Sequence, residues 1–307
     1  MTENDAAIAA GNASGSYPSA DANVVFYEAF APYYERLYGR VDVPETVRQW
    51  LLLLRDNGIL TRQSLTHEPR PKLIDIGCGP GSHLIAWAKA GFLVCGLDSS
   101  QTMLNLAARN LEIALPDETI PLYCMDVRSV TDVFERVDLA VSHLNFLNLF
   151  APRELEDTCK GAARLVKPGG YWLVDCSMLK ERPSDLRETH VDDGITLIAQ
   201  FRTTEDCYEQ RWLAEGLDAT EYYWFHNRQE YEEAAAAGGW RVVDWFEWRP
   251  DNSAAPWISS SSVSERNVLV LCRNGANDPG DVAEGKVPHC EESNSSIDIS
   301  GVEDHAI

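Results

Sequence analysis

The chain has 307 residues, of which 45% are hydrophobic and 24% are charged, and its formal net charge is −22. This length suits one large or two small domains, and the composition is typical of a globular protein in water. Because binding to phosphates needs a basic surface, the acidic charge argues against nucleic acid as the main partner and favours neutral or cationic ligands.

Local composition disfavours several other classes. The eight cysteines are scattered without a C-x-x-C pair, so we expect reduced thiols in a cytoplasmic protein, with neither disulfides nor metal sites. There is no long uncharged apolar stretch for a membrane span, and the N-terminus lacks the features of a signal peptide. Residues 1–22 and the acidic residues 274–307 are expected to be disordered tails of one domain that covers residues 23–273.

The first predicted elements are helical. Residues 24–42 are rich in aromatic side chains, and Pro32 predicts two short helices in place of one long helix. Two interpretations of Tyr27 and Tyr34 in this segment stay open, namely packing on the core or covering a ligand pocket. Residues 43–60 have the apolar spacing of an amphipathic helix.

Residues 73–98 predict a strand, a glycine turn, a helix and a second strand. The first apolar run contains Asp75, the second ends in Asp98, and three glycines lie between them at positions 77, 79 and 81. Two parallel strands joined in this way form a right-handed βαβ unit. Glycines let a backbone approach a ligand closely, and an acid about 20 residues further on is placed to bind ribose hydroxyls.

The spacing of the three glycines bears on which cofactor this unit could bind. A dinucleotide site would have the spacing G-x-G-x-x-G, whereas the spacing here is G-x-G-x-G because position 82 is serine. A glycine turn in another α/β fold is a third possibility when the motif is taken alone.

The alternation of helices and strands continues and is then interrupted. Asp126 ends the third predicted strand, and the turn Lys167-Pro168-Gly169-Gly170 precedes the fifth. Between about residues 178 and 226 we expect a β-rich insertion over the strand ends, as a lid or platform for substrate. The predicted helices are 101–115, 152–166 and 229–237, and the predicted strands are 120–125, 137–142, 171–174, 195–201, 207–213, 221–225, 240–248 and 267–273, with a serine-rich loop at 250–265.

Several of these motifs occur together in one known family. The D-x-G-x-G-x-G pattern, the acids at 98 and 126, the K-P-G-G turn and the segment FYEAFAPYYERLY resemble the class I methyltransferases that use S-adenosylmethionine, in the branch that acts on small molecules. The resemblance covers about residues 24–273. It implies an α/β fold with a Rossmann-like, seven-stranded, mostly parallel sheet, an antiparallel last strand and helices on both faces, plus the small β-rich insertion.

The resemblance also implies cofactor contacts. Backbone groups at Gly77, Gly79 and Gly81 would approach the methionyl and ribose part. Asp75 would reach toward the ammonium group, and Asp98 would bind the ribose hydroxyls. The other implied cofactor contacts are Tyr27, Tyr34, Met103, Asp126, Val127 and Ser142. Asp126 would bind the adenine amine, or it could simply cap the next helix, and Met103 could pack on adenine or in the core.

The substrate side is less strongly patterned. Methyl transfer mainly requires binding, orienting and dehydrating two reactants, so no metal is needed. His143 follows the fourth strand and could be a general base, or it could only hydrogen-bond its surroundings. Asn145 could orient the substrate. The aromatic group Tyr223, Trp224 and His226 could form a substrate wall or fill the core.

The predicted function is transfer of a methyl group from S-adenosylmethionine to a nitrogen or oxygen of a small molecule, such as an amine or a phenol. The alternatives are a cyclase-type reaction with the same cofactor, a protein methyltransferase and a non-catalytic scaffold. Residues 142–150 contain no N/D-P-P-Y motif, which further argues against nucleic-acid bases as substrates. The acceptor and the oligomeric state stay open.

Overall fold

The computed structural model describes residues 19–38, 41–60, 65, 69–131, 135–179, 187–192, 195–202, 207–247 and 264–275. The tails predicted for residues 1–22 and 274–307 lie mostly outside the described residues, and so does most of the predicted serine-rich loop.

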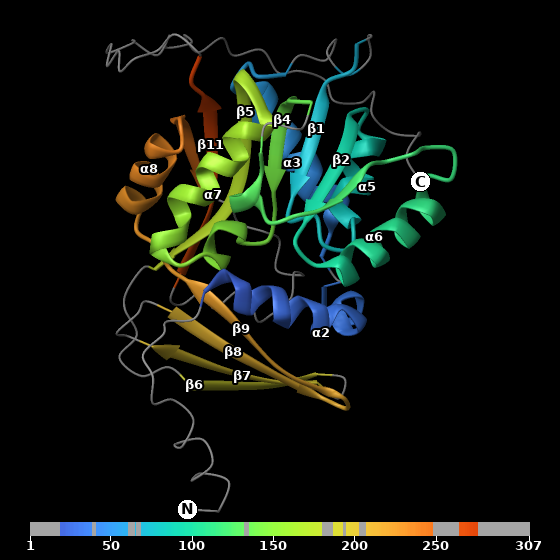
Figure 1. Ribbon diagram of the computed structural model, residues 1–307, viewed down its shortest axis with the longest axis vertical. Helices are drawn as coiled ribbons and strands as arrows, with labels where there is room; N and C mark the ends of the chain where they lie inside the picture. Colours follow the sequence, from blue (N-terminus) through green and yellow to red (C-terminus); the bar gives the residue numbers. More distant parts are fainter. Residues whose placement is uncertain are drawn as a thin grey trace, which may run out of the picture. The chain divides into compact units, whose positions relative to one another are not determined.

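A seven-stranded sheet forms the centre of the fold (Figure 1). Its strands are β1 (Lys72–Ile76), β2 (Leu93–Asp98), β3 (Leu122–Cys124), β4 (Val137–Ser142), β5 (Val166–Leu179), β10 (Trp240–Glu247) and β11 (Ser264–Arg273). They are ordered β10-β11-β5-β4-β1-β2-β3. Strand β11 is antiparallel to both of its neighbours, and the other paired strands are parallel. The predicted Rossmann-like sheet with an antiparallel last strand is therefore confirmed.

Helices cover both faces of this sheet. They are α2 (Ala20–Tyr38), α3 (Val43–Asp56), α5 (Ser82–Lys89), α6 (Gln101–Ala114), α7 (Pro152–Leu165) and α8 (Arg228–Ala237), with short 3-10 helices η1 (Val127–Ser129) and η2 (Phe146–Leu149). The alternation of side chains along β1 serves both faces. Ile74 and Ile76 pack with the side chains of α7 and α8, whereas Leu73 packs with those of α3 and α5.

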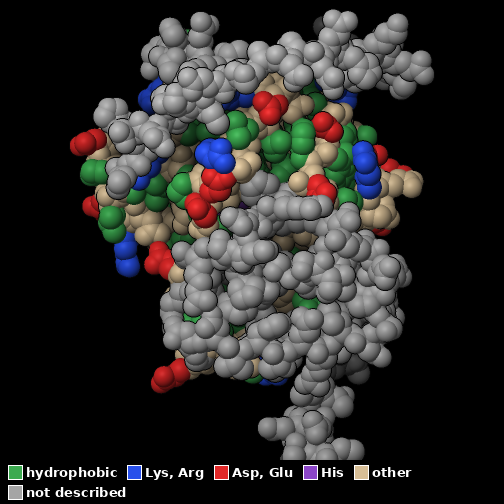
Figure 2. All heavy atoms as spheres, turned by 180° about the vertical axis from the view of Figure 1, so that it is seen from behind, with side chains coloured by type: hydrophobic (Ala, Val, Ile, Leu, Met, Phe, Trp, Pro, Cys, Tyr) green, Lys and Arg blue, Asp and Glu red, His purple; other side chains and the backbone are tan. Residues whose placement is uncertain are grey.

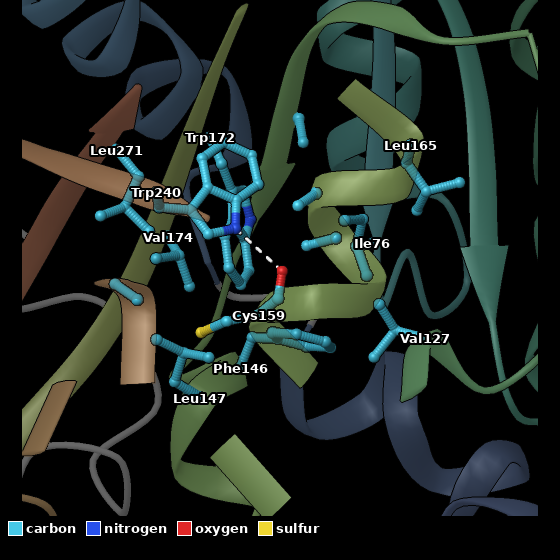
Figure 3. Close-up of a cluster of buried hydrophobic side chains, with 14 of the residues drawn as sticks. Ile76, Val127, Phe146, Leu147, Cys159, Leu165, Trp172, Val174, Trp240 and Leu271 are labelled. Carbon is cyan, nitrogen blue, oxygen red and sulfur yellow. Dashed lines mark hydrogen bonds between the residues drawn. The ribbon is translucent and has the colours of Figure 1, made fainter. Parts of the chain in front are cut away.

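Large aromatic side chains fill the core on the α7 and α8 side of the sheet. Trp172 and Trp240 lie with their ring centroids 5.5 Å apart. The indole Nε1 of Trp240 donates a hydrogen bond of 2.8 Å to the carbonyl oxygen of Cys159, so that its polar atom is satisfied within the cluster (Figure 3).

The K-P-G-G segment leaves the ladder at the start of β5. Val137 of β4 pairs with Val166, and Leu139 then pairs with Tyr171, so the residues between Val166 and Tyr171 project from the sheet. Gly169 within this excursion has φ +79°. The predicted turn is present, although the strand already begins at Val166.

A separate antiparallel sheet is formed by β6 (Arg187–Asp192), β7 (Ile195–Arg202), β8 (Cys207–Ala214) and β9 (Leu217–Trp224), in that order. The predicted β-rich insertion is thus observed. Its first strand was not predicted, because the sequence RETHVD of β6 is mostly polar and has no apolar run.

The prediction of two short N-terminal helices was wrong. Helix α2 is continuous from Ala20 to Tyr38 and contains Pro32, and it begins inside the segment that we assigned to the tail. Proline removes one backbone hydrogen bond from a helix. Here that cost is offset by burial of Phe26 and Phe30, which pack against Trp212 of β8.

Helix α2 connects the two sheets (Figure 1). On one side, the Asn23 side chain exchanges two hydrogen bonds of 2.8 Å with the backbone of Tyr222 in β9. On the other side, the carboxylate of Glu28 accepts hydrogen bonds from Ser100 and Thr102 at the start of α6. The helix therefore lies between the carboxyl ends of the parallel strands and the four-stranded sheet.

Charged side chains of both signs are mixed on the described part of the face drawn in Figure 2. None of the helices in the described ranges has the length and apolar character needed to cross a bilayer.

Candidate functional site

A cavity lies at the carboxyl ends of β1, β2, β3 and β4, where it is covered by α2. Counted together with its open mouth, the cavity has about 1220 Å³ of space. The strand order reverses between β1 and β4, and open α/β sheets bind their ligands at such a reversal. The position and size of this cavity therefore suit a ligand as large as a nucleoside derivative.

The glycine turn after β1 forms the cavity floor. Gly77 has φ +79°, and a Cβ atom there would lie 2.7 Å from Cδ2 of Phe146, so no side chain fits. Gly79 has φ +51°, and a Cβ atom there would have only the hydroxyl of Tyr34 nearby, at 4.0 Å. The turn is thus closely packed at Gly77 and open toward the cavity at Gly79.

Gly81 has a packing role. It is the N-cap of α5 with φ +82°, and a Cβ atom there would lie 3.2 Å from Cβ of Ala107 in α6. It is not among the residues that line the cavity. The absence of a side chain lets α5 pack closely against α6, and the cofactor contact of Gly81 stays a prediction.

Asp75 is a buried carboxylate that borders the cavity. Its side chain is 1% exposed, and its Oδ1 atom has no hydrogen-bond partner among the described residues. Burial, reinforced by the nearby Asp98, raises the pKa of Asp75 to about 8. An unsatisfied buried oxygen costs free energy. Its position at the cavity therefore indicates that a ligand supplies the missing donor.

Asp98 fixes the glycine turn. Its Oδ2 accepts a hydrogen bond of 2.8 Å from the backbone N–H of Gly79, and its Oδ1 accepts one of 2.9 Å from the N–H of Ser100. Burial raises the pKa of Asp98. Each carboxylate oxygen has a second lone pair, so Asp98 can still accept hydrogen bonds from ligand hydroxyls.

Asp126 and Val127 line the cavity as predicted, but the Asp126 carboxylate already has a partner. Its Oδ1 accepts a 2.8 Å hydrogen bond from the backbone N–H of Arg128, and its Oδ2 pairs with the guanidinium at 2.5 Å. The capping interpretation of Asp126 is therefore observed, and its contact with adenine stays a prediction.

Arg128 is a site residue that the sequence patterns missed. Besides Asp126, its guanidinium pairs with Asp21 of α2 at 2.5 Å and with Glu154 of α7 at 2.6 Å. It thereby fastens the start of α2 to the rim of the cavity. These partners are far apart in the sequence, so no local pattern signals the cluster.

Three further predicted cofactor residues are found at the cavity. Tyr27 and Tyr34 line it from α2, and Met103 lines it from the first turn of α6. Burial, together with the nearby carboxylates of Glu221 and Asp98, raises the pKa of Tyr34 above its usual range. Tyr34 is therefore a neutral hydrogen-bonding group at the glycine turn.

His143 also borders the cavity, but its contacts limit its use as a base. The indole Nε1 of Trp87 donates to Nε2 of His143 at 3.0 Å. Because an indole only donates, this Nε2 is unprotonated and the ring proton lies on Nδ1. The ring stacks between Trp50, at 4.0 Å, and His83, at 3.9 Å between centroids. Protonation of Nε2 would break the bond to Trp87, so this geometry favours a packing role.

The remaining predicted residues are absent from the lining of this cavity; they are Ser142, Asn145, Tyr223, Trp224 and His226. The hydroxyl of Ser142 accepts a hydrogen bond of 3.1 Å from Trp172. The amide oxygen of Asn145 accepts one of 2.8 Å from Ser177. These two side chains hold the end of β4 in place.

The three aromatic positions at the end of the insertion are buried. Nε2 of His226 donates to the carbonyl of Phe150 at 3.0 Å, and burial lowers the pKa of His226 to about 4. Trp224 packs with Cys207, and Tyr223 packs with Tyr208. None of these three residues lines the cavity, and their contact with a substrate stays a prediction.

The turn after β4 is strained where it borders the cavity. Leu144 and Asn145 have φ of +58° and +61°, in the left-handed region that a leucine rarely adopts. The backbone N–H of Leu144 donates to Oδ2 of Asp175 at 3.1 Å, which stabilises the turn. Such strain is concentrated at ligand sites and costs about 1–3 kcal/mol per residue. Within the described residues, no three His, Cys, Asp or Glu side chains are grouped to hold a metal ion.

Comparison with known proteins supports this site. Residues 73–170 match the family described as a methyltransferase domain. A putative methyltransferase of Bacillus subtilis, YqeM, is 27% identical over 154 residues, which are 49% of this chain and 55% of the relative. The aligned region is thus about half of that protein. A ubiquinone biosynthesis O-methyltransferase of Brucella anthropi is 26% identical over 217 residues, which are 68% of this chain and 76% of the relative.

The fold has solved counterparts. A crystal structure of an S-adenosylmethionine-dependent methyltransferase from Clostridium acetobutylicum has a TM-score of 0.61 and 16% identity, and the match covers 81% of this chain and 99% of that one. At this identity the similarity concerns the fold. Together, the two comparisons show that residues 73–170 match a methyltransferase domain and that the chain has the fold of S-adenosylmethionine-dependent methyltransferases.

Proposed function

We propose that this chain transfers a methyl group from S-adenosylmethionine to a nitrogen or oxygen atom of a small molecule. The observation that carries the proposal is the buried carboxylate of Asp75, whose Oδ1 has no hydrogen-bond partner in the part of the chain that the structure describes, at the same cavity as the open backbone of Gly79. A cationic ligand that lies against the glycine turn satisfies both features.

The residues present fit this cofactor. Asp75 would hold the methionyl ammonium, Asp98 would accept the ribose hydroxyls, and Met103 and Val127 would pack on the adenine ring. Asp126 lies beside them, but its two oxygens already accept four hydrogen bonds from Arg128, so Arg128 would have to give up one of them for Asp126 to bind the adenine amine. When bound, the cofactor supplies a methyl group that its sulfonium has already activated.

The protein's own task is then to orient the acceptor and exclude water. The cavity lining is largely apolar beyond the glycine turn, with Leu144, Phe146 and Phe150 contributed by the segment after β4. Helix α2 covers this lining and is itself fastened by Arg128 and by the four-stranded sheet. These features favour a dehydrated site in which a nucleophile and the methyl carbon are held in line.

A small acceptor is supported by the covered cavity and by the relative from Brucella anthropi, an O-methyltransferase of ubiquinone biosynthesis. A cyclase-type reaction would use the same cofactor contacts, and a protein substrate would have to reach under α2. Both are distinguished from the proposal by the experiment below.

The test combines binding with turnover. Calorimetry should detect binding of S-adenosylmethionine, and incubation with methyl-labelled cofactor and separate amines, phenols and carboxylates should label at least one of them. Failure to bind the cofactor would refute the proposed site. Binding with labelling of added proteins alone would favour the protein methyltransferase. Binding with consumption of the cofactor but no labelled acceptor would favour other chemistry.

A further inference from the structure

A buried carboxylate that the cofactor contacts do not use lies between α2 and the four-stranded sheet. Glu221 of β9 has 0% exposure, and the hydroxyl of Tyr27 donates a hydrogen bond of 2.5 Å to its Oε1. Tyr27 also lines the cavity. A single hydrogen bond therefore connects Glu221 to the site.

The other groups around Glu221 are uncharged and come from three elements. Tyr27 on α2 donates a hydrogen bond to it, Tyr223 on β9 and Trp212 on β8 lie near it, and all three partly offset the effect of burial on its pKa. Gln210 is opposite it in the ladder. Its charge also reaches Tyr34, whose hydroxyl lies over Gly79. Burial raises the pKa of Glu221 to about 7, so this carboxylate exchanges its proton near neutral pH.

The carboxylate of Glu221, one hydrogen bond away from the cavity through Tyr27, favours a cationic acceptor. The acids in the cavity lining itself are Glu35, Asp75, Asp98 and Asp126, of which Asp75 and Asp98 are assigned to the cofactor and Asp126 pairs with Arg128. Among the lining residues, Arg128 is the lone Lys or Arg, and three carboxylates already pair with it. An amine enters such a site as an ammonium ion, but an ammonium nitrogen has no lone pair. It must lose a proton before it can attack a methyl group.

We propose that Tyr27 and Glu221 form a proton relay that deprotonates an amine acceptor. The inference rests on the proposed methyltransferase function. Tyr27 touches the acceptor, and Glu221 acts through Tyr27 as a positioning and proton-storing residue. The hydroxyl oxygen of Tyr27 takes a proton from the ammonium nitrogen while its own proton passes to Oε1 of Glu221.

The neutral nitrogen then uses its freed lone pair to form the bond to the methyl carbon. The carbon–sulfur bond breaks, and its electron pair stays on the sulfur. The nitrogen keeps the protons that it still carries, so the methylated amine leaves as an ammonium ion. Glu221 then returns the stored proton to solvent. No oxidant, metal or further reactant is needed.

The test compares two amines of similar size that differ in basicity, ethylamine and 2,2,2-trifluoroethylamine. Ethylamine is protonated at neutral pH and needs the relay, whereas the fluorinated amine is mostly the free base. General-base catalysis contributes about 100-fold or more. Glu221→Gln and Tyr27→Phe should therefore lower kcat/KM for ethylamine about 100-fold more than kcat/KM for trifluoroethylamine.

A matched control is Tyr33→Phe. The Tyr33 hydroxyl also bonds α2 to the insertion, through the carbonyl of Glu215, but Tyr33 does not line the cavity. This variant should have the same kcat/KM as the wild type for both amines. A second readout does not need turnover: affinity of ethylammonium for the S-adenosylhomocysteine complex should rise with pH through about 7 in the wild type and stay flat in Glu221→Gln.

Each outcome decides the inference. Equal losses for the two amines, or an unchanged pH profile in both variants, would show that Glu221 only holds α2 and would overturn the relay. Labelling of phenols but not of amines would overturn it while leaving the methyltransferase function intact. Absence of cofactor binding in the wild type would instead refute the proposed function itself. Should Glu221→Gln fail to fold, Tyr27→Phe gives the same comparison.

Discussion

The Oδ1 atom of Asp75, for which the described residues offer no hydrogen-bond partner, predicts that the cofactor drives a proton out of the site when it binds. With a pKa of about 8, roughly nine in ten Asp75 side chains carry a proton at pH 7 in the cofactor-free protein. The methionyl ammonium needs the carboxylate form. Binding at pH 7 should therefore release about 0.9 proton per site, and this release should disappear above pH 9.

The same reasoning predicts how the affinity for the cofactor depends on pH. Removal of the proton costs about 1.4 kcal/mol for each pH unit below the pKa, so the affinity of the wild type relative to that of Asp75→Asn should rise about tenfold between pH 7 and pH 9. Asp75→Asn cannot ionise and loses a charge-assisted hydrogen bond of about 1.5–3 kcal/mol, which weakens binding roughly 10- to 150-fold at high pH.

Calorimetry in phosphate and in Tris measures the released proton, because these buffers have different ionisation enthalpies. The Asp75→Asn variant is titrated with the same ligand, so ionisation of the cofactor's own amino group cancels in the difference. Equal enthalpies in both buffers at pH 7 for the wild type, or the same proton release in the variant, would refute the role of Asp75.

The stability of the cofactor-free protein independently checks the direction in which folding shifts the pKa of Asp75. The pKa of Asp75 is higher in the folded than in the unfolded chain. The unfolded chain therefore releases this proton first as the pH rises, and Asp75 lowers the free energy of unfolding progressively between about pH 4 and pH 8. Asp75→Asn should remove this decline, so its stability relative to the wild type should be greatest at pH 8.

Three further predictions follow from local geometry. Gly77→Ala combines a positive φ with overlap on Phe146, so it should lower the free energy of unfolding, measured by urea denaturation, by about 2–4 kcal/mol. In the control Gly58→Ala, φ is +66° but the space around the new methyl group is open, so the loss should be about 1 kcal/mol. Asp98→Ala should weaken cofactor binding at least tenfold by calorimetry, since it frees the N–H of Gly79 and removes the ribose acceptor; unchanged affinity would contradict this. His143→Phe keeps the aromatic stack and should retain the pH profile of kcat/KM, whereas loss of the fall in kcat/KM at low pH would restore His143 as the base.

The periodic helices and strands, and the edge of the sheet that holds the cofactor cavity, could be predicted from the sequence. The apolar run at residues 73–76 and the glycines after it have a local spacing that defines the βαβ unit, and Asp75 and Asp98 follow from their positions at strand ends. Such features depend on neighbours in the chain. The role of Gly81 was not accessible, because its close neighbour Ala107 belongs to another helix.

Apart from strand β6, whose polar sequence gave no strand pattern, the errors concern contacts between distant segments. Pro32 predicts a helix break from local chemistry alone, but burial of Phe26 and Phe30 against the insertion overrides that preference. Arg128 and Glu221 likewise acquire their partners only when α2 is in place. These residues resemble ordinary surface or strand positions in the sequence, since no motif links them.

The position of α2 has a consequence for recombination between relatives. One stripe of the helix, including Tyr27 and Tyr34, faces the cofactor cavity, while the stripe with Phe26 and Phe30 fits the four-stranded sheet. An insertion taken from a relative would therefore meet a helix shaped for a different partner. A functional chimera should require exchange of Ala20–Tyr38 together with the insertion. Although more than a hundred residues separate them in the sequence, these two segments should therefore change together among relatives.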